Sequence, residues 1–333
     1  MLTGLSTVGL VSVVGCLDDS EHLTIGVGPA GSRSHQAAHA LAVGVERHSN
    51  QLTLRIESVG PSAERLYALA DREIAAAGVD NTTLYRASED CGVFDLEALE
   101  TVPHQGFAYG YREHYWLAVD GDHSTTPLST AELIDHTVHP GQPSEPSRLV
   151  TEQLLRDAGL WERLEIDNRP HAEVATAADQ RALECLLAVQ HSGQQLTSWS
   201  AAVDEAAGER LAAVSVGSAF QTAIDEAPNA LARRVAPVGW RRAALDETVD
   251  GWAVPLQWLW SPSVDSAVVE ELTRIAAEHS ETIREVDPLS LDGEPDSLAS
   301  GVIEELTVHA GAADAFSALS SHDSDWTEDH AAD

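Results

Sequence analysis

The stretch LTIGVGPAGSRSHQAAHALAVGV (residues 23–45) decides the fold, because it joins three local signals in a fixed order. The apolar run at residues 23–28 predicts a buried strand. The Pro/Gly/Ser sequence at residues 29–32 predicts a turn. From Ser34 to about His48, apolar side chains recur at roughly every fourth position, which predicts a helix packed on one face.

The same strand–turn–helix unit recurs in the first third of the chain. Residues 52–57 alternate as a strand and are followed by a helix at about 64–71. A short strand at 75–79 leads through the turn Asp80-Asn81-Thr82 into a further helix. Repeated units of this kind are typical of a parallel sheet with helices packed on it.

The second half of the sequence has the same style. Strands are expected at 115–119, 137–139 and 251–260, and helices at 129–134, 148–158, 265–279 and 297–308. Two α/β halves predict two lobes with a cleft between them, onto which turns at the carboxyl ends of the strands open. Helix N-termini at such turns offer N–H groups and positive dipole ends. The pattern therefore predicts a hinged protein that binds an anion.

We expect five divisions along the chain. They are a signal peptide and linker at 1–21, the first part of lobe I at 22–119, lobe II at 120–240, a return to lobe I with C-terminal helices at 241–319, and an acidic tail at 320–333.

The composition indicates a protein that works in concentrated salt and argues against nucleic acid as a partner. The 333 residues carry 54 acids and 19 bases, which gives a formal net charge of −35, and every base other than histidine is an arginine. A chain this acidic repels phosphate backbones, so nucleic-acid binding is not expected. Abundant acids without lysine indicate a protein that works in molar salt, as halophilic proteins do. Apolar residues make up 43% of the chain, enough for a sizeable core.

The N-terminal segment indicates export. The first fifteen residues are uncharged and small or apolar, and Val13-Val14-Gly15-Cys16 resembles a lipobox, in which the cysteine is acylated. A lipid on Cys16 would hold the protein at the extracytoplasmic face of the cell membrane. The alternative is a buried first helix or strand. Cys91 and Cys185 are expected to be buried free thiols, although they could pair.

Five motifs occur in the order in which one known family has them. They are GPAGSRSHQAAHALA (28–42), ESVGPSAERL (57–66), GQPSEPSR (141–148), PVGW (237–240) and HAGA (309–312). Together they resemble the TAXI family, the extracytoplasmic solute-binding proteins of tripartite ATP-independent (TRAP) transporters. The resemblance implies a two-lobed, periplasmic-binding-protein-like (type II) α/β fold.

The same resemblance implies a function. The protein would capture a small organic anion, such as a dicarboxylate, glutamate or 2-oxoglutarate, and deliver it to the membrane permease subunits of a TRAP transporter. No cofactor is implied. Runner-up interpretations are a ligand-sensing binding protein for a signalling receptor and, more distantly, a zinc-dependent hydrolase.

The chain departs from the family at the turns that face the ligand. The family's threonine falls on Arg33 and its tyrosine pair on Ser34 and His35. Acids stand in two turns, Asp80 where the family has Q-S-D and Glu145 where it has S-G-T. Because these substitutions fall at ligand-facing turns, the resemblance supports the fold more strongly than it supports the family's ligand class.

Ten residues are candidate ligand contacts: Arg33, Ser34, His35, Ser62, Asp80, Asn81, Ser144, Glu145, Ser147 and Trp240. Arg33 could form a bidentate pair with a carboxylate, or bond to one of the many acids. The serines are also good helix N-caps, and the acids could bind an amine or be surface charge. Arg148 is the next cation along, whereas Arg65 is expected on an exposed helix.

Catalysis and metal binding have little support in the sequence. His35 and His39 are four residues apart, a spacing that can hold zinc, but no HExxH pattern accompanies them. The sequence holds no G-x-S-x-G nucleophile elbow and no P-loop. We therefore expect neither an enzyme nor a metal protein.

Folding is predicted to depend on salt, because uncompensated negative charges repel one another at low ionic strength. Dialysis from molar KCl into dilute buffer should abolish the near-ultraviolet circular dichroism of the folded protein. An unchanged spectrum would contradict the halophilic interpretation.

Overall fold

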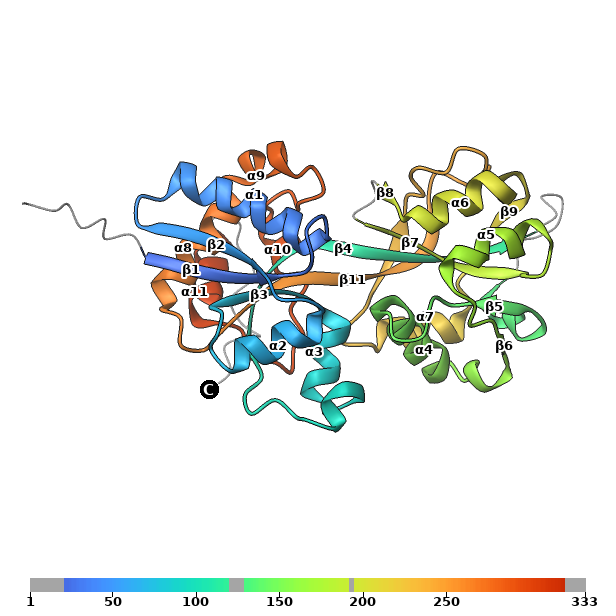
Figure 1. The fold of residues 1–333 in the computed structure, drawn as a ribbon, viewed down its shortest axis with the longest axis horizontal. Helices are drawn as coiled ribbons and strands as arrows, with labels where there is room; N and C mark the ends of the chain where they lie inside the picture. The colour runs from blue at the N-terminus through green and yellow to red at the C-terminus, as the bar shows by residue number, and fades with distance from the viewer. Residues whose placement is uncertain (1–20, 120–128, 192–194, 321–333) are drawn as a thin grey trace, which may run out of the picture.

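The structure is a computed structural model that describes residues 21–119, 129–191 and 195–320. The predicted leader with Cys16 and the acidic tail after Ser320 lie outside the described residues. The chain forms two lobes side by side, joined by two long strands (Figure 1). In the ranges described, no helix has both the length and the apolar character needed to cross a bilayer.

Lobe I begins with the three strand–turn–helix units that the sequence predicts. They are β1 (Glu21–Val27) with α1 (Arg33–His48), β2 (Leu52–Ser58) with α2 (Ser62–Ala70), and β3 (Ala76–Asp80) with α3 (Asn81–Ser88). The three strands are parallel and stand in the order β2-β1-β3. Ser32 caps α1 by accepting a hydrogen bond from the His35 backbone N–H. Because all three strands run parallel, their carboxyl ends meet at one edge of the sheet.

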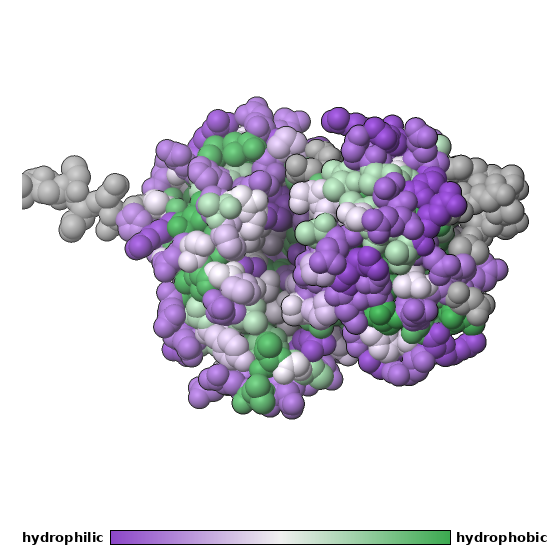
Figure 2. Space-filling model, turned by 45° about the vertical axis from the view of Figure 1, so that its right-hand side comes forward, coloured by the Kyte–Doolittle hydropathy of each residue, from purple (hydrophilic) through white to green (hydrophobic). Residues whose placement is uncertain are grey.

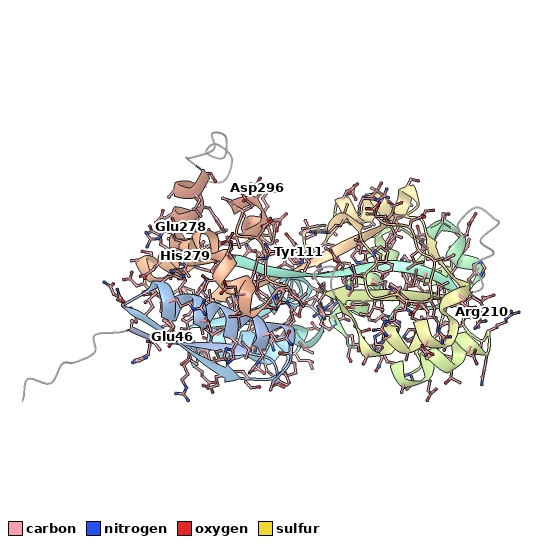
Figure 3. The ribbon with its side chains drawn as sticks, turned by 90° about the horizontal axis from the view of Figure 1, so that it is seen from above. Glu46, Tyr111, Arg210, Glu278, His279 and Asp296 are labelled. Atoms are coloured by element: carbon pink, nitrogen blue, oxygen red, sulfur yellow. The ribbon has the colours of Figure 1, made fainter. Side chains whose placement is uncertain are left out.

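Two antiparallel strands, β4 (His104–Val119) and β11 (Val249–Trp260), belong to both lobes. The second half of β11 pairs with β3 in lobe I, whereas its first half pairs with β10 (Leu231–Val235) in lobe II. The second half of β4 pairs with β7 (Cys185–His191). Figure 3 shows Tyr111 at the waist, where β4 passes between the lobes. The predicted divisions at 119 and 240 assign each strand whole, and the pairing shows that each serves both lobes.

Lobe II is built on the far halves of these strands. Its other elements are β5 (Thr137–His139), α4 (Pro146–Asp157), β6 (Glu165–Ile166), α5 (His171–Asp179), β8 (Gln195–Leu196), α6 (Ser198–Ala207), β9 (Leu211–Val214) and α7 (Ser218–Asp225). Short 3₁₀ helices lie in lobe II at Thr130–Asp135, Trp161–Arg163 and Gly208–Arg210, and one lies in lobe I at Gly92–Asp95. The predicted strand at 115–119 is the end of the much longer β4. The sequence pattern does not predict a strand over the first half of β4, because Gly106 and Gly110 interrupt its apolar residues.

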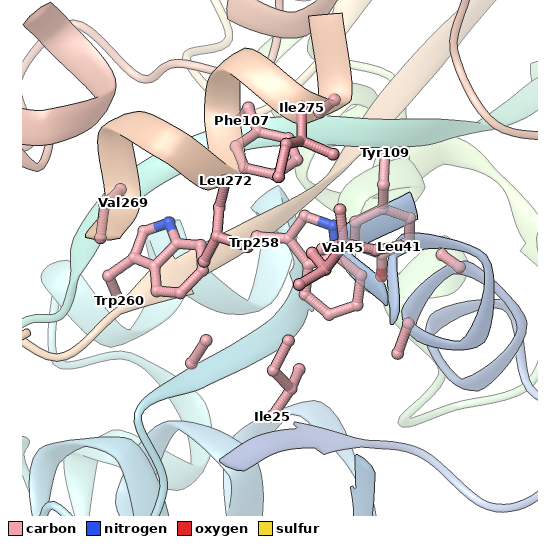
Figure 4. Packing of buried hydrophobic residues seen from close by; sticks show 14 of the residues in the cluster. Ile25, Leu41, Val45, Phe107, Tyr109, Trp258, Trp260, Val269, Leu272 and Ile275 are labelled. Carbon is pink, nitrogen blue, oxygen red and sulfur yellow. The ribbon is translucent and has the colours of Figure 1, made fainter. Parts of the chain in front are cut away.

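The chain then returns to lobe I as α8 (Ser266–Glu278), α9 (Ser280–Val286), α10 (Pro295–Ala299) and α11 (Ala310–Ser320). Helices α1 and α8 cover one face of the lobe I sheet and bury its aromatic residues. Trp258 and Trp260 of β11 lie in this core with Leu272 of α8 (Figure 4). The rings of Trp258 and Tyr109 have centroids 4.6 Å apart, a pairing worth about 1 kcal/mol.

The predicted helix at 297–308 is wrong, because buried amide side chains hold most of this segment in another shape. After α10, the N–H of Ile303 donates to Gln105 Oε1 (2.7 Å). Gln105 Nε2 donates in turn to the Ile303 and Leu306 carbonyls (both 2.9 Å). Gly301 lies so close to β4 and β11 that a Cβ there would be 3.3 Å from Ala108 and Pro255. The segment therefore packs against the two shared strands.

Candidate functional site

The first turn of the candidate site is held by its own serines. Ser34 is buried, and its hydroxyl accepts a hydrogen bond from the Gly28 N–H (3.0 Å). The Ser32 and Ser34 oxygens are 3.4 Å apart. This turn follows β1, where the strand order reverses and ligands of open α/β sheets bind. His35, half-buried on α1, has its ring centroid 6.4 Å from that of His39.

Arg65 ties the turns after β2 and β3 together, and its predicted exposure is wrong. It is 7% exposed, and it donates to the Gly78 carbonyl (2.9 Å), the Gly60 carbonyl and Ser62 Oγ (2.8 Å). Ser62 donates in turn to Asp80 Oδ2 (2.9 Å), and Asp80 caps α3. Burial lowers the pKa of the Arg65 guanidinium. The polar groups of Ser62 and Asp80 are thus engaged within lobe I.

Asn81 also bonds inward. Its side-chain amide is 2% exposed, donates to the Gly301 carbonyl (2.7 Å) and accepts from Gln257 Nε2 (2.6 Å). A buried amide with both ends bonded fixes the start of α3 to β11 and to the segment after α10.

Arg33 has an acidic partner that lies 254 residues away in the sequence. Its Nη1 is 2.5 Å from Asp287 Oδ2, and both side chains are 6% exposed. Its Nη2 donates to the Tyr109 carbonyl (3.1 Å) on β4. The pair joins the start of α1 to the residue after α9, so the charge of Arg33 is compensated before any ligand arrives.

In lobe II, the predicted residues cluster at the start of α4. Ser147 is buried, and its oxygen is 3.0 Å from His114 Nε2 on β4. Glu145 precedes the helix and has an oxygen 3.4 Å from His171 Nε2. Ser144 is exposed with φ +80°, so it presents its side chain and backbone to solvent. Arg148 donates to the Gly141 carbonyl (3.1 Å).

Trp240 lies elsewhere in lobe II. It is half-buried against the apolar cluster that includes Tyr115, and its Nε1 donates to the Tyr115 hydroxyl (2.5 Å). Cys185 is buried as expected, but Cys91 is exposed, because it stands in the turn before a 3₁₀ helix. Across the three described ranges, no group of three His, Cys, Asp or Glu side chains is placed to hold a metal ion.

Sequence reasoning missed Arg112 and His191, which face each other across β4 and β7 at the waist. Burial, Arg112 and Arg33 together lower the pKa of His191 to about 3, so its ring is neutral. Burial lowers the pKa of His114 as well, and Arg112 and His191 add to this effect. The signal that could have found Arg112 is a charged residue inside the aromatic run FAYGYREHYW at 107–116.

Figure 2 shows the molecular surface hollowed between the two lobes. One groove of about 500 Å³ lies between the end of α3, the turn after α7 and the segment after α10. Glu89, Glu226 and Glu305 line it, so its potential repels anions. A further cavity, of about 20 Å³, lies inside the apolar core of lobe I. This acidic groove therefore does not suit an anion.

Solved structures with a similar fold are the only known proteins that the comparisons match to this chain. No protein-family model and no curated protein matches the sequence. A TctC solute-binding protein from Polaromonas matches 90% of this chain and 98% of its own, with 13% identity and a TM-score of 0.51. A probable amino-acid ABC transporter extracellular-binding protein from Bacillus subtilis matches 83% of this chain and 99% of its own, with 10% identity and a TM-score of 0.47. The periplasmic aliphatic sulphonate binding protein from Escherichia coli matches 80% and 78%, with 13% identity and a TM-score of 0.41.

The Polaromonas likeness shows the fold that the sequence predicts, a two-lobed α/β fold of the periplasmic-binding-protein kind.

We predict that Arg33 stabilises lobe I. Arg33→Met leaves Asp287 buried without its cation, and breaking a buried pair in this way costs about 3–5 kcal/mol. The matched control is Arg47→Met, because Arg47 pairs with Glu285 and joins the same two helices, but both side chains are more than half exposed. Urea unfolding in molar salt should show a large loss for the first variant and little change for the second. Equal midpoints would contradict this role.

Proposed function

We propose that this protein is an extracytoplasmic solute-binding protein that captures a small organic anion for a TRAP-type secondary transporter. The proposal rests mainly on how the lobes are connected. Among the described residues they share only the two strands β4 and β11, and polar turns from both lobes lie beside this waist. Two crossing strands act as a hinge, and closure about a hinge encloses a ligand between lobes. The fold likeness to a TctC solute-binding protein supports the same function.

The site of the proposed solute draws on both lobes. Lobe I offers the turn after β1, which begins α1 and carries Gly28 and Ser32. Lobe II offers the start of α4, where Ser144 is exposed and Glu145 is half-buried. Backbone N–H groups at these helix starts favour a carboxylate, whereas Glu145 favours an amine on the same ligand. Five of the predicted contact residues bond within their own lobes, so in this proposal they hold the turns in place: Arg33, Ser62, Asp80, Asn81 and Ser147.

The partner and the location rest on the sequence. The motif order that resembles the TAXI family supports a TRAP permease as the partner, and the lipobox-like run supports an anchor on Cys16 at the outer face of the membrane. Fractionation of cells that express the full chain or Cys16→Ser tests the anchor, because only the full chain should stay with the membrane.

Solute capture predicts a ligand-dependent rise in thermal stability. A ligand that binds only the folded state, present at a concentration 100 times its dissociation constant, adds about 2.7 kcal/mol to the free energy of unfolding. A thermal-shift screen in molar KCl should test dicarboxylates, 2-oxo acids, amino acids, sugars and amines. The proposal predicts a shift with at least one carboxylate class. A flat response to all five classes would contradict solute binding, and a response to sugars or amines alone would contradict the anion.

A further inference from the structure

Arg112 is an arginine at the waist without an acidic partner. It is half-buried on β4, opposite His191 on β7 and Val254 on β11. Within the described ranges, its guanidinium has neither a hydrogen bond nor an ion pair. Some arginines are paired, as Arg47 is with Glu285 and Arg242 with Glu205, whereas exposed arginines such as Arg55 have no ion pair with a described residue. Arg112 differs from those exposed arginines because it is partly buried, and a partly buried charge without a partner is costly.

The strand geometry explains why the adjacent acid does not neutralise Arg112. Successive side chains of a strand point to opposite faces, so Glu113 faces away from Arg112. Glu113 is instead 3.2 Å from Arg233 Nε and accepts from Gln190 Nε2 (2.8 Å). The nearest acid in sequence is therefore engaged on the other face of the sheet.

The cations around Arg112 are already compensated. Arg33 pairs with Asp287, and the charge of Arg65 is linked to Asp80 through Ser62. Both guanidiniums and that of Arg112 act on the phenol of Tyr109, which shows that the three lie near one another. His191 beside them is neutral. The cluster is thus left with one uncompensated positive charge, on Arg112.

One polar atom beside Arg112 also lacks a partner. His191 Nδ1 is buried and has no hydrogen bond to any described residue. Because Arg112 and His191 are cross-strand neighbours on one face of the sheet, a group bound to the guanidinium is within reach of this ring. The neutral imidazole can donate one hydrogen bond from this nitrogen.

We propose that Arg112 is the anchor for a carboxylate of the bound solute, and that the solute presents one carboxylate to the waist. This proposal rests on the proposed function and specifies its ligand class. The planar guanidinium binds a carboxylate through two parallel hydrogen bonds, with His191 Nδ1 as a further donor. A single free charge fits a single carboxylate, so any second acidic group of the ligand has to be held by uncharged donors. An anion bound at the strand that both lobes share contacts both lobes.

The test is calorimetric titration in molar KCl with pyruvate, L-glutamate and succinate as carboxylate probes and glucose as a neutral probe. The proteins are the parent, Arg112→Gln, Arg112→Lys and the control Arg55→Gln, which changes an exposed arginine on β2. We expect Arg112→Gln to weaken the carboxylate that the parent binds by roughly 30-fold or more. Arg112→Lys should restore part of the affinity, and Arg55→Gln should bind as the parent does. The empty forms of the parent and Arg112→Gln should melt at the same temperature, because Arg112 has no partner in the fold.

Each other outcome counts against the anchor. Equal carboxylate affinity in the parent and Arg112→Gln would overturn it, as would an equal loss in Arg55→Gln. A marked fall in the melting temperature of empty Arg112→Gln would assign the residue a structural role instead. Binding of glucose but of no carboxylate would overturn the anchor and leave solute capture in place. Absence of any response to the four probes in the parent, together with a flat thermal-shift screen, would overturn both.

Discussion

Two strands that belong to both lobes are the constraint on which the rest of the structure depends. Trp258 and Trp260 fix one end of β11 in the lobe I core, and Trp252 fixes the other end in lobe II. The aromatic residues Phe107 and Trp116 anchor β4 in the same way. Because each strand is buried at both ends, any change in the angle between the lobes has to be absorbed at the waist. Here β4 contains Gly110, and the pairing between β4 and β11 shifts register after Leu256.

Electrostatics at the waist differ from those of the molecule as a whole. The chain has a net charge of −35, yet Arg33, Arg65 and Arg112 all act electrostatically on Tyr109 of β4. Arg33 is paired with Asp287, and Arg65 is linked to Asp80 through the hydroxyl of Ser62. The third, Arg112, lies on β4 opposite His191 of β7 and has no partner among the described residues. In molar salt the screening length is about 3 Å, so distant surface acids hardly oppose an anion that contacts Arg112 directly.

Local patterns predicted the elements of this fold far better than they predicted its polar partners. Periodicity and glycine turns located β1 with α1 and the two units that follow, because these signals lie within twenty residues of one another. The helix at 297–308 failed because Gln105 and Gln257, which hold this segment, come from distant strands. The same reason applies to Arg33: the sequence shows a cation at a turn, but its partner Asp287 is 254 residues away.

The candidate site shows the same division. The turns at residues 28–34, 60–62 and 80–81 were located in the sequence, yet the structure engages most of their side chains in bonds within lobe I. The sequence predicts Arg65 on an exposed helix, but its guanidinium donates to the Gly60 and Gly78 carbonyls beneath the turns. Arg112 has no motif to mark it. Arg112 is a candidate because it has no partner among the described residues, and only the structure can show this.

We expect the two lobes to close about β4 and β11 when an anion binds between them. Spin labels at His39→Cys on α1 and Thr176→Cys on α5, both exposed positions in different lobes, report this movement by pulsed electron resonance. The labels are placed in a Cys91→Ser background, because Cys91 is an exposed thiol. With the carboxylate that most raises the melting temperature, the distance between the labels should become shorter and its distribution narrower. A distribution that the bound carboxylate leaves unchanged would contradict closure about the shared strands.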